Sequence, residues 1–233
     1  MLSRKLNYED PFNFNELKQY LPDRHAVHSH HCFFCNYQED NNVFFETANY
    51  YLYADRSPIV EGHLMILSKG HYGCAGELSN ALQDELIALK ALAEQLVIEV
   101  YGKASCYEHG RAGHCVQYAG TNNPCHHFHL HVLPVNVAIQ EPLKKLYKEL
   151  TLGQYPDLEN AYERYGNYLY FETSSNEKYF YSVNEKAVES HLLRTLICNE
   201  LNTPEKSQWE NFQDPALQRI AYEKYKKFLA DFA

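Results

Sequence analysis

The sequence predicts an α+β fold in which a mainly antiparallel β-sheet packs against helices. Three observations indicate this class. Short segments rich in Val, Ile, Phe and Tyr, bounded by polar turn residues, are typical of strands. One long segment keeps apolar residues at helical spacing. Up to residue 134 the predicted order is strand, strand, helix, strand, strand, which favours an α+β sandwich over repeated parallel β-α units.

Local patterns predict each element of this first stretch. A short helix is expected at residues 14–21, and Pro22 is expected to end it. A leucine stripe predicts a long helix that begins after Ser79, a suitable N-cap, and ends near residue 101. Gly and Asn residues predict a polar loop at 110–124. Strands, the first two antiparallel to each other, are expected at residues 43–53, 62–67, 104–108 and 126–134.

The rest of the chain changes in character and predicts a C-terminal α/β extension. Its expected elements are a helix at 142–150, a hairpin of strands at 167–172 and 178–183, and helices at 186–201 and 215–232. We therefore expect three parts: a lead-in over residues 1–24, a core over residues 25–138 and the extension over residues 139–233. No flexible linker separates the last two, so we expect the extension to pack on the core.

Composition narrows the classes of function. The chain has 233 residues, 45% of them hydrophobic and 22% charged, as in an ordinary globular protein. The net charge of -9 argues against general nucleic-acid binding, although a small nucleotide needs only a few local donors. No segment reaches the roughly 18 apolar residues of a membrane span, and no apolar run suggests a signal peptide. Seven unevenly spread Cys residues fit free thiols and a metal site in a reducing compartment, so we expect a cytoplasmic protein.

The most informative segment contains three alternating histidines, His127, His129 and His131. On a strand they would share one face, and the intervening apolar side chains would pack into a core on the other. Neighbouring same-face positions lie about 6.5–7 Å apart, which is twice the rise per residue of a strand. Three imidazoles at that spacing converge poorly on one ion. A division among metal binding, chemistry and substrate binding is therefore favoured.

Other residues leave two interpretations open. Cys32 and Cys35 have the spacing of a zinc-binding pair, but two buried thiols beside aromatic residues would look the same. Asp55 follows a strand and could be a binding residue or a simple turn residue. Arg194, on a predicted helix, is expected to be an ordinary surface charge. Further histidines that could complete a metal site are His28, His30, His31 and His71.

Three landmarks together resemble the histidine triad (HIT) superfamily. The first is the run His127-Phe128-His129-Leu130-His131-Val132-Leu133. The second is the stretch 52–71, in which an Asp follows a strand, Pro58 comes three residues later and a Gly-His strand ends in Lys-x-His. The third is Cys32-x-x-Cys35, as in zinc-containing members. The match covers about residues 25–138. Within the superfamily, the chain resembles the diadenosine polyphosphate hydrolase-like HIT proteins.

The resemblance implies a HIT-like core and a role for each residue at a matching position. His129 would be the nucleophile that attacks the α-phosphate of a nucleotide, and His131 would contact the phosphate or the leaving group. Asp55 would bind the ribose hydroxyls. The zinc ligands would be Cys32, Cys35, His71 and His127, a closed set that implies structural Zn²⁺.

The loop before the histidine run departs from the family pattern. Many members carry phosphate-binding residues such as Gly-Gln-Ser there, and in this chain Thr121, Asn122 or Asn123 could replace them. The expected function is that of a hydrolase or nucleotidyl transferase acting on a dinucleoside polyphosphate or a nucleoside phosphoramidate. Two alternatives remain: a nucleotide phosphorylase, and a non-catalytic nucleotide sensor with structural zinc. The expected partner is a nucleotide-type small molecule, and the resemblance also allows a homodimer.

Overall fold

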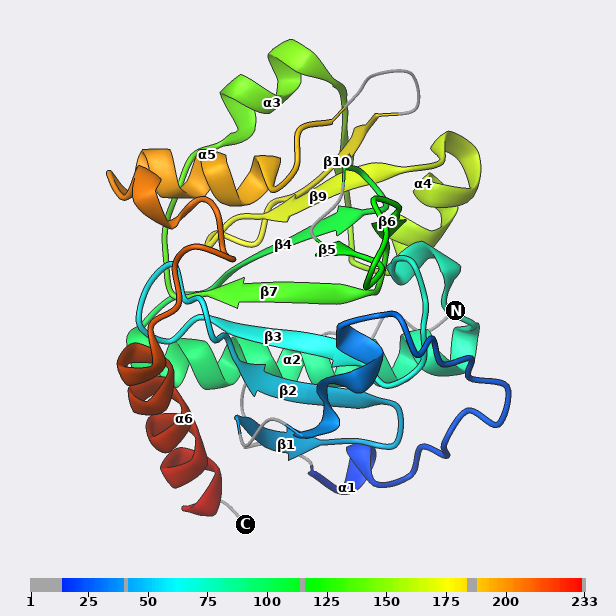
Figure 1. The fold of residues 1–233 in the computed structure, drawn as a ribbon, viewed down its shortest axis with the longest axis vertical. Helices are drawn as coiled ribbons and strands as arrows, with labels where there is room; N and C mark the ends of the chain where they lie inside the picture. The colour runs from blue at the N-terminus through cyan, green and yellow to red at the C-terminus, as the bar shows by residue number, and fades with distance from the viewer. Residues whose placement is uncertain (1–13, 40–41, 114–115, 184–187, 232–233) are drawn as a thin grey trace.

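The computed structural model describes residues 14–39, 42–113, 116–183 and 188–231. Among these residues, eight strands form one sheet in the order β1-β2-β3-β7-β4-β9-β10-β8, and all neighbouring strands are antiparallel (Figure 1). The predicted α+β class is therefore confirmed. Strands from both sides of residue 138 belong to this sheet, because β9 pairs directly with β4.

The bounds of the elements are as follows. The strands of the large sheet are β1 Val43–Glu46, β2 Tyr50–Ala54, β3 Leu64–Ser68, β4 Ser105–Gly110, β7 His129–Leu133, β8 Lys148–Leu152, β9 Tyr168–Glu172 and β10 Lys178–Ser182. A separate small hairpin contains β5 Val116–Gln117 and β6 Pro124–Cys125. The α-helices are α1 Phe14–Leu17, α2 Asn80–Tyr101, α3 Gln140–Leu146, α4 Asp157–Tyr165, α5 Leu192–Glu200 and α6 Pro215–Ala230. Short 3₁₀ helices are formed by Phe34–Glu39, Ala75–Glu77 and Pro204–Lys206.

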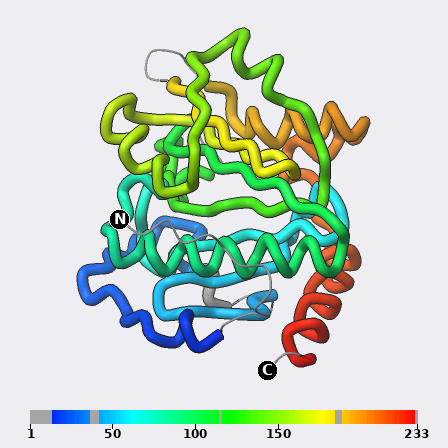
Figure 2. Tube along the Cα trace, turned by 180° about the vertical axis from the view of Figure 1, so that it is seen from behind, coloured from blue at the N-terminus to red at the C-terminus, as the bar shows by residue number. Residues whose placement is uncertain are grey.

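One face of the sheet is covered by α2, which crosses it in the view of Figure 2. The leucine stripe of this helix is buried together with Leu130 and Val132 of β7 and with neighbouring apolar side chains. The helix ends at Gly102, whose φ of 89° is readily adopted only by glycine. Ser79 precedes the helix as predicted, but its side chain makes no capping hydrogen bond.

The opposite face of the sheet carries the histidines. The strand register places Tyr53, Met65, His131 and Tyr107 side by side on β2, β3, β7 and β4. His129 lies two positions along β7 on the same face. Helix α5 packs on this face through apolar side chains that include Leu193. The larger apolar core thus lies on the α2 side of the sheet, and the histidines lie on the other face beside a smaller apolar cluster that includes α5.

Several elements differ from those predicted, and the helix expected at 14–21 ends at Leu17. The strand expected at 43–53 is a hairpin of β1 and β2, because the Glu85 carboxylate accepts hydrogen bonds from the backbone and side chain of Asn49 in the turn. The helix expected at 142–150 ends at Leu146, and the following residues form β8, which pairs with β10. Helix α4 was not predicted.

Some predictions fall on residues outside the described part of the chain. These are residues 1–13 of the lead-in, residues 114–115 of the predicted polar loop, residues 186–187 of one predicted helix and residue 232 of another. Within the described part, no helix is both long enough and apolar enough to cross a membrane.

Candidate active site and metal centre

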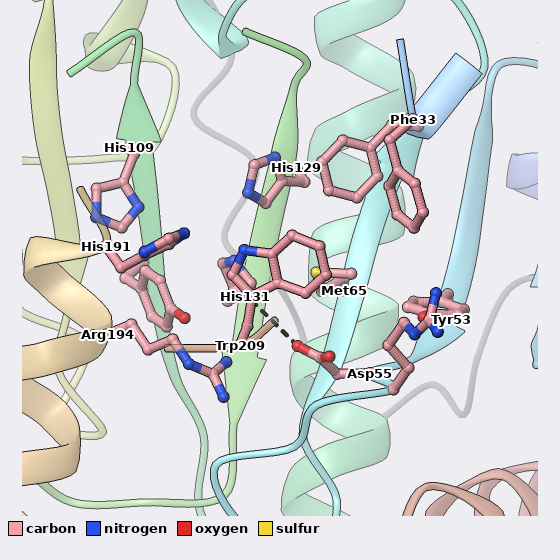
Figure 3. Close-up of a pocket in the computed structure, with 13 residues that line it drawn as sticks. Phe33, Tyr53, Asp55, Met65, His109, His129, His131, His191, Arg194 and Trp209 are labelled. Carbon is pink, nitrogen blue, oxygen red and sulfur yellow. Dashed lines mark ion pairs between the residues drawn. The ribbon is translucent and has the colours of Figure 1, made fainter. Parts of the chain in front are cut away.

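A cavity of about 490 Å³, part of which is open to solvent, lies on the histidine-bearing face of the sheet. Figure 3 shows the side chains that line it. His129 and His131 of β7 lie at its centre, with Asp55, Tyr53 and Phe33 on one side and His109, His191 and Arg194 on the other. Segments 33–34, 53–56, 107–109 and 191–209 thus meet around one strand.

The ring of His129 is held in a defined orientation. Its Nδ1 lies 2.7 Å from the carbonyl oxygen of His127 and donates to it, because a carbonyl can only accept. The lone pair of the neutral ring is therefore on Nε2, and no described residue forms a hydrogen bond with that atom. Burial lowers the pKa of His129 to about 4, so the ring is neutral near pH 7. A neutral imidazole with an accessible Nε2 can act as a nucleophile.

His131 is positioned directly by Tyr107 and His63, and through His63 by Asp55. Tyr107 stacks on its ring, with the ring centroids 4.2 Å apart and the planes 11° from parallel. Nε2 of His63 lies 2.9 Å from its Nδ1, and Nδ1 of His63 lies 3.3 Å from Oδ2 of Asp55. Burial lowers the pKa of His63 to about 4 and that of His131 well below its usual range. Asp55, His63 and His131 therefore form a buried chain of polar groups that ends in the cavity.

Aromatic and apolar side chains form the wall beside Asp55. Phe34 lies 4.9 Å from His129 between ring centroids, and Phe33 lies 6.0 Å from Trp209. Tyr53 and Met65 complete this wall from the sheet. A flat apolar ligand fits such a surface, since aromatic rings favour stacked and edge-to-face contacts.

Sequence reasoning missed the contribution of the C-terminal segment. Arg194 was expected at the surface, but this prediction is wrong: its side chain is 3% exposed and lines the cavity. It is held there by hydrogen bonds to the carbonyls of Ser57 and Lys206. The sequence did contain a signal for the burial of Arg194, because Leu193 and Ile197 flank it on the apolar face of α5. His191 and Trp209 carried no comparable signal.

Next to the cavity, four predicted metal ligands lie together. The ligand atoms of Cys32, Cys35, His71 and His127 are all within 4.8 Å of one another. His127 Nδ1 is 3.3 Å from His71 Nδ1, 3.5 Å from Cys32 Sγ and 3.6 Å from Cys35 Sγ. A tetrahedral zinc site with usual bond lengths places its ligand atoms about 3.3–3.8 Å apart. The donor set therefore fits Zn²⁺.

Partners of the two imidazoles also suit metal binding. His127 Nε2 is 2.9 Å from the carbonyl of Ser68, which leaves Nδ1 as the ligating atom. His71 Nε2 is 3.0 Å from the hydroxyl of Tyr118. The prediction that His127, His129 and His131 all lie on one strand is wrong, because β7 begins at His129. His127 precedes the strand and turns toward the cysteines.

Other predicted residues lie elsewhere. Asn122 and Asn123 are exposed in the loop between β5 and β6 and do not line the cavity. Their predicted phosphate contacts thus stay a prediction without support from the arrangement of the site. The remaining histidines considered for the metal site are exposed and outside the four-residue cluster, namely His28, His30 and His31.

Comparison with known proteins gives sequence relatives and structural matches. The chain is 25% identical over 176 residues to CWF19-like protein 1 of Pongo abelii, an alignment that covers 70% of this chain and 30% of the relative. The chain thus spans about 30% of the length of this curated relative.

Solved structures that align with the chain include a HIT family hydrolase from Clostridium thermocellum and the yeast Ap4A phosphorylase Apa2 in complex with AMP. The first is 20% identical, with 45% of this chain and 90% of that chain covered and a TM-score of 0.33. The second is 11% identical, with 73% and 75% covered and a TM-score of 0.35. At these scores the alignments say little about the arrangement of this chain.

A protein-family model described as "Protein similar to CwfJ C-terminal" matches residues 22–148. This stretch contains 127 of the 233 residues, more than half of the chain. It includes the cysteine pair, Asp55 and the histidine run, and so covers most of the cavity and the whole metal cluster. The chain therefore belongs to the family of proteins similar to the CwfJ C-terminal region.

Proposed function

We propose that this protein is a HIT-type nucleotide hydrolase or nucleotidyl transferase that forms a covalent intermediate on His129. Nε2 of His129 would attack the α-phosphorus of a nucleoside phosphate derivative, and the leaving group would depart with the electron pair of the broken bond. Water or another acceptor would then attack the same phosphorus, and the N–P electron pair would return to Nε2.

One observation carries this proposal: Nδ1 of His129 donates to the carbonyl of His127 inside a cavity that Asp55 and aromatic residues line. The hydrogen bond selects the tautomer whose lone pair is on Nε2. After attack the ring becomes cationic but keeps its Nδ1 proton, which the His127 carbonyl continues to accept. The arrangement thus supports both formation and breakdown of a nucleotidyl-histidine.

The other cavity residues support binding of the nucleoside. The wall of Phe33, Tyr53 and Trp209 would contact the base. Asp55 would accept hydrogen bonds from the ribose hydroxyls, as the superfamily resemblance implies. His131 would contact the phosphate or the leaving group from its place beside His129.

The metal cluster would hold a structural zinc ion. Two thiolates and two imidazoles would fill all four positions of a tetrahedral site, so no position would be left for substrate. The ligands come from three distant segments, and the ion would fix the segment around Cys32 and Cys35, and with it Phe33, beside the cavity.

The test is to trap the intermediate. The protein is mixed with diadenosine tetraphosphate or adenosine 5′-phosphoramidate, quenched, and examined by mass spectrometry for a nucleotidyl adduct on His129. His129→Asn, which can still donate to the His127 carbonyl, should lose the adduct and at least about a thousandfold in turnover. Exposed His28, changed to Asn, is the matched control and should change neither.

Two outcomes would support other functions. Product that incorporates inorganic phosphate in place of water would indicate a phosphorylase. Tight nucleotide binding without an adduct or product would indicate a sensor and would contradict the proposed chemistry.

A further inference from the structure

Arg194 is a buried cation in the wall of the cavity. Its Nε donates to the carbonyl of Lys206 at 2.8 Å, and Nη2 donates to the carbonyl of Ser57 at 2.6 Å. These bonds fix the guanidinium but do not neutralise its charge. Among the described residues it forms no ion pair with a carboxylate, and none accepts from its remaining N–H groups. A charge buried to this extent is costly unless it is paired.

The Glu210 carboxylate, whose side chain is 48% exposed, lies 3.9 Å from Nε2 of His191 but forms no ion pair with Arg194. The Lys206 ammonium donates to the carbonyl of Ile59 at 2.9 Å, so the residue whose backbone carbonyl bonds Arg194 carries a second cation. Asp55 is a buried carboxylate of the cavity, but it lies on the other side of His131 from Arg194, and its Oδ1 accepts from the backbone N–H of Ser57. The C-terminal side of the cavity is therefore arranged for an anion that enters with a ligand.

The position of Arg194 indicates which part of a ligand this anion would be. In Figure 3, Arg194, His191 and His109 lie on one side of His129 and His131, Asp55, Tyr53 and Phe33 lie on the other, and Trp209 overlaps His131 in the view. A nucleoside bound against the aromatic wall, with its α-phosphate at His129, would direct the group beyond that phosphate toward Arg194. This is the place of the leaving group in the first step and of the acceptor in the second.

We propose that Arg194, with His109 and His191, forms a subsite for a phosphate group beyond the α-phosphate. This inference rests on the function proposed above and narrows its substrates to phosphoanhydrides. The Nε2–Pα bond forms, the bond between Pα and the bridging oxygen breaks, and the released phosphate keeps the electron pair. Inorganic phosphate could occupy the same subsite as the acceptor. A phosphoramidate, which releases an uncharged amine, would gain nothing from Arg194.

The kinetic test compares two substrates in two variants. Arg194→Gln removes the charge, and Arg194→Lys retains it. For diadenosine tetraphosphate, Arg194→Gln should lower kcat/KM by about 10–100-fold, the effect of losing one charge-assisted hydrogen bond. For adenosine 5′-phosphoramidate the change should stay within about threefold, and Arg194→Lys should recover part of the loss. Arg219→Gln, on the exposed face of α6, is the matched control. Equal effects on both substrates would overturn the proposal.

A binding test keeps the subsite separate from the catalytic proposal. Calorimetric titration with AMP and ADP, and with GMP and GDP, measures the gain in affinity from a second phosphate. The parent protein should bind the diphosphates at least about tenfold more tightly, and Arg194→Gln should remove this difference. The same result without turnover would reject the catalytic proposal but support the subsite. Equal binding of mono- and diphosphates by the parent would overturn the subsite itself.

A third measurement separates the two sources of the phosphate. Turnover in ¹⁸O-labelled water with added inorganic phosphate shows which acceptor enters the product. AMP labelled with ¹⁸O would show that water is the acceptor, so that the subsite holds only the phosphate of the leaving group. ADP that contains the added phosphate would show that the subsite also holds the acceptor. Circular dichroism and thermal unfolding check that the Arg194 variants remain folded.

Discussion

Nε2 of His63 lies 2.9 Å from Nδ1 of His131, which places one histidine directly behind another. His63 is fully buried and does not line the cavity, so it can reach a substrate only through His131. Its Nδ1 lies 3.3 Å from Asp55 Oδ2 and accepts from the backbone N–H of Ile59 at the same distance. His63 is therefore a positioning residue that fixes the ring and the tautomer of His131.

Replacing His63 should slow the chemical step more than it weakens binding. We expect His63→Leu to lower kcat about 10–100-fold while KM changes less than about threefold, since His131 stays in place but loses its hydrogen-bond partner. His63→Gln, which can still donate toward His131, should recover part of the activity. Steady-state kinetics with diadenosine tetraphosphate give both constants. A change confined to KM, or an equal loss in both variants, would contradict this role.

Loss of the metal cluster should destabilise the fold as well as release zinc. Elemental analysis should find about one zinc per chain. Cys32→Ser should lose that zinc, because a hydroxyl is a much poorer zinc ligand than a thiolate. We expect the variant to lose about 3 kcal/mol of unfolding free energy, which would lower Tm by about 6–12 °C for a chain of this size. Chelation of the parent protein should have a similar effect on thermal unfolding.

Cys125 provides the matched control for the metal prediction. It is buried in the same apolar cluster as Cys32 and Cys35 but is not one of the four grouped ligands. Cys125→Ser should therefore keep the zinc and a Tm close to that of the parent. Zinc loss in this variant, with retention in Cys32→Ser, would show that the ligand set is wrong.

The sequence predicted the centre of the site better than its edges. Alternation placed His129 and His131 on one face of a strand, and the register with Leu67 and Met65 agrees. Alternation could not show that the strand begins only at His129, because the position of His127 depends on contacts with Ser68 and the cysteines. Strand boundaries reflect such tertiary contacts, which local patterns do not encode.

The C-terminal contribution was the main omission. Arg194 bonds to Ser57, which is 137 positions away, and no local pattern indicates such a contact. The end of α3 shows the same limit. Residues after Leu146 have good helix formers, but pairing with β10 turns them into an edge strand. In both cases the tertiary environment decides the structure against a weak local preference.

Trp209 should contribute to binding of the base. Its ring lines the cavity near Phe33, whereas its backbone carbonyl accepts from the Ser57 hydroxyl and is unaffected by side-chain truncation. Trp209→Ala should weaken AMP binding about 5–100-fold, the range expected for loss of one base–aromatic contact. Ribose 5-phosphate, which lacks a base, is the control ligand and should bind both proteins equally. Equal weakening of both ligands in calorimetry would contradict a base contact.

Glu108 should make stability depend on pH. Its carboxyl is 1% exposed on the α2 side of the sheet, and burial raises its pKa from an ordinary 4.5 to about 8. Between these two values the folded protein keeps a proton that the unfolded chain has released. The free energy of unfolding should therefore fall as pH rises from about 4.5 to 8, by up to about 1.4 kcal/mol per pH unit from this group.

Glu108→Gln removes this titration and keeps a group that can bond to the N–H of Ala75 and the hydroxyl of Tyr168. Because the amide is neutral at every pH, the variant should resemble the parent near pH 4.5 and become the more stable protein as pH approaches 8. Urea unfolding at half-unit pH steps measures the difference. Glu99→Gln, at an exposed position of α2, should follow the parent. If the unfolding free energies of the parent and Glu108→Gln changed in parallel between pH 4.5 and 8, the buried carboxyl would be ionised over this whole range, stabilised by its hydrogen-bond donors.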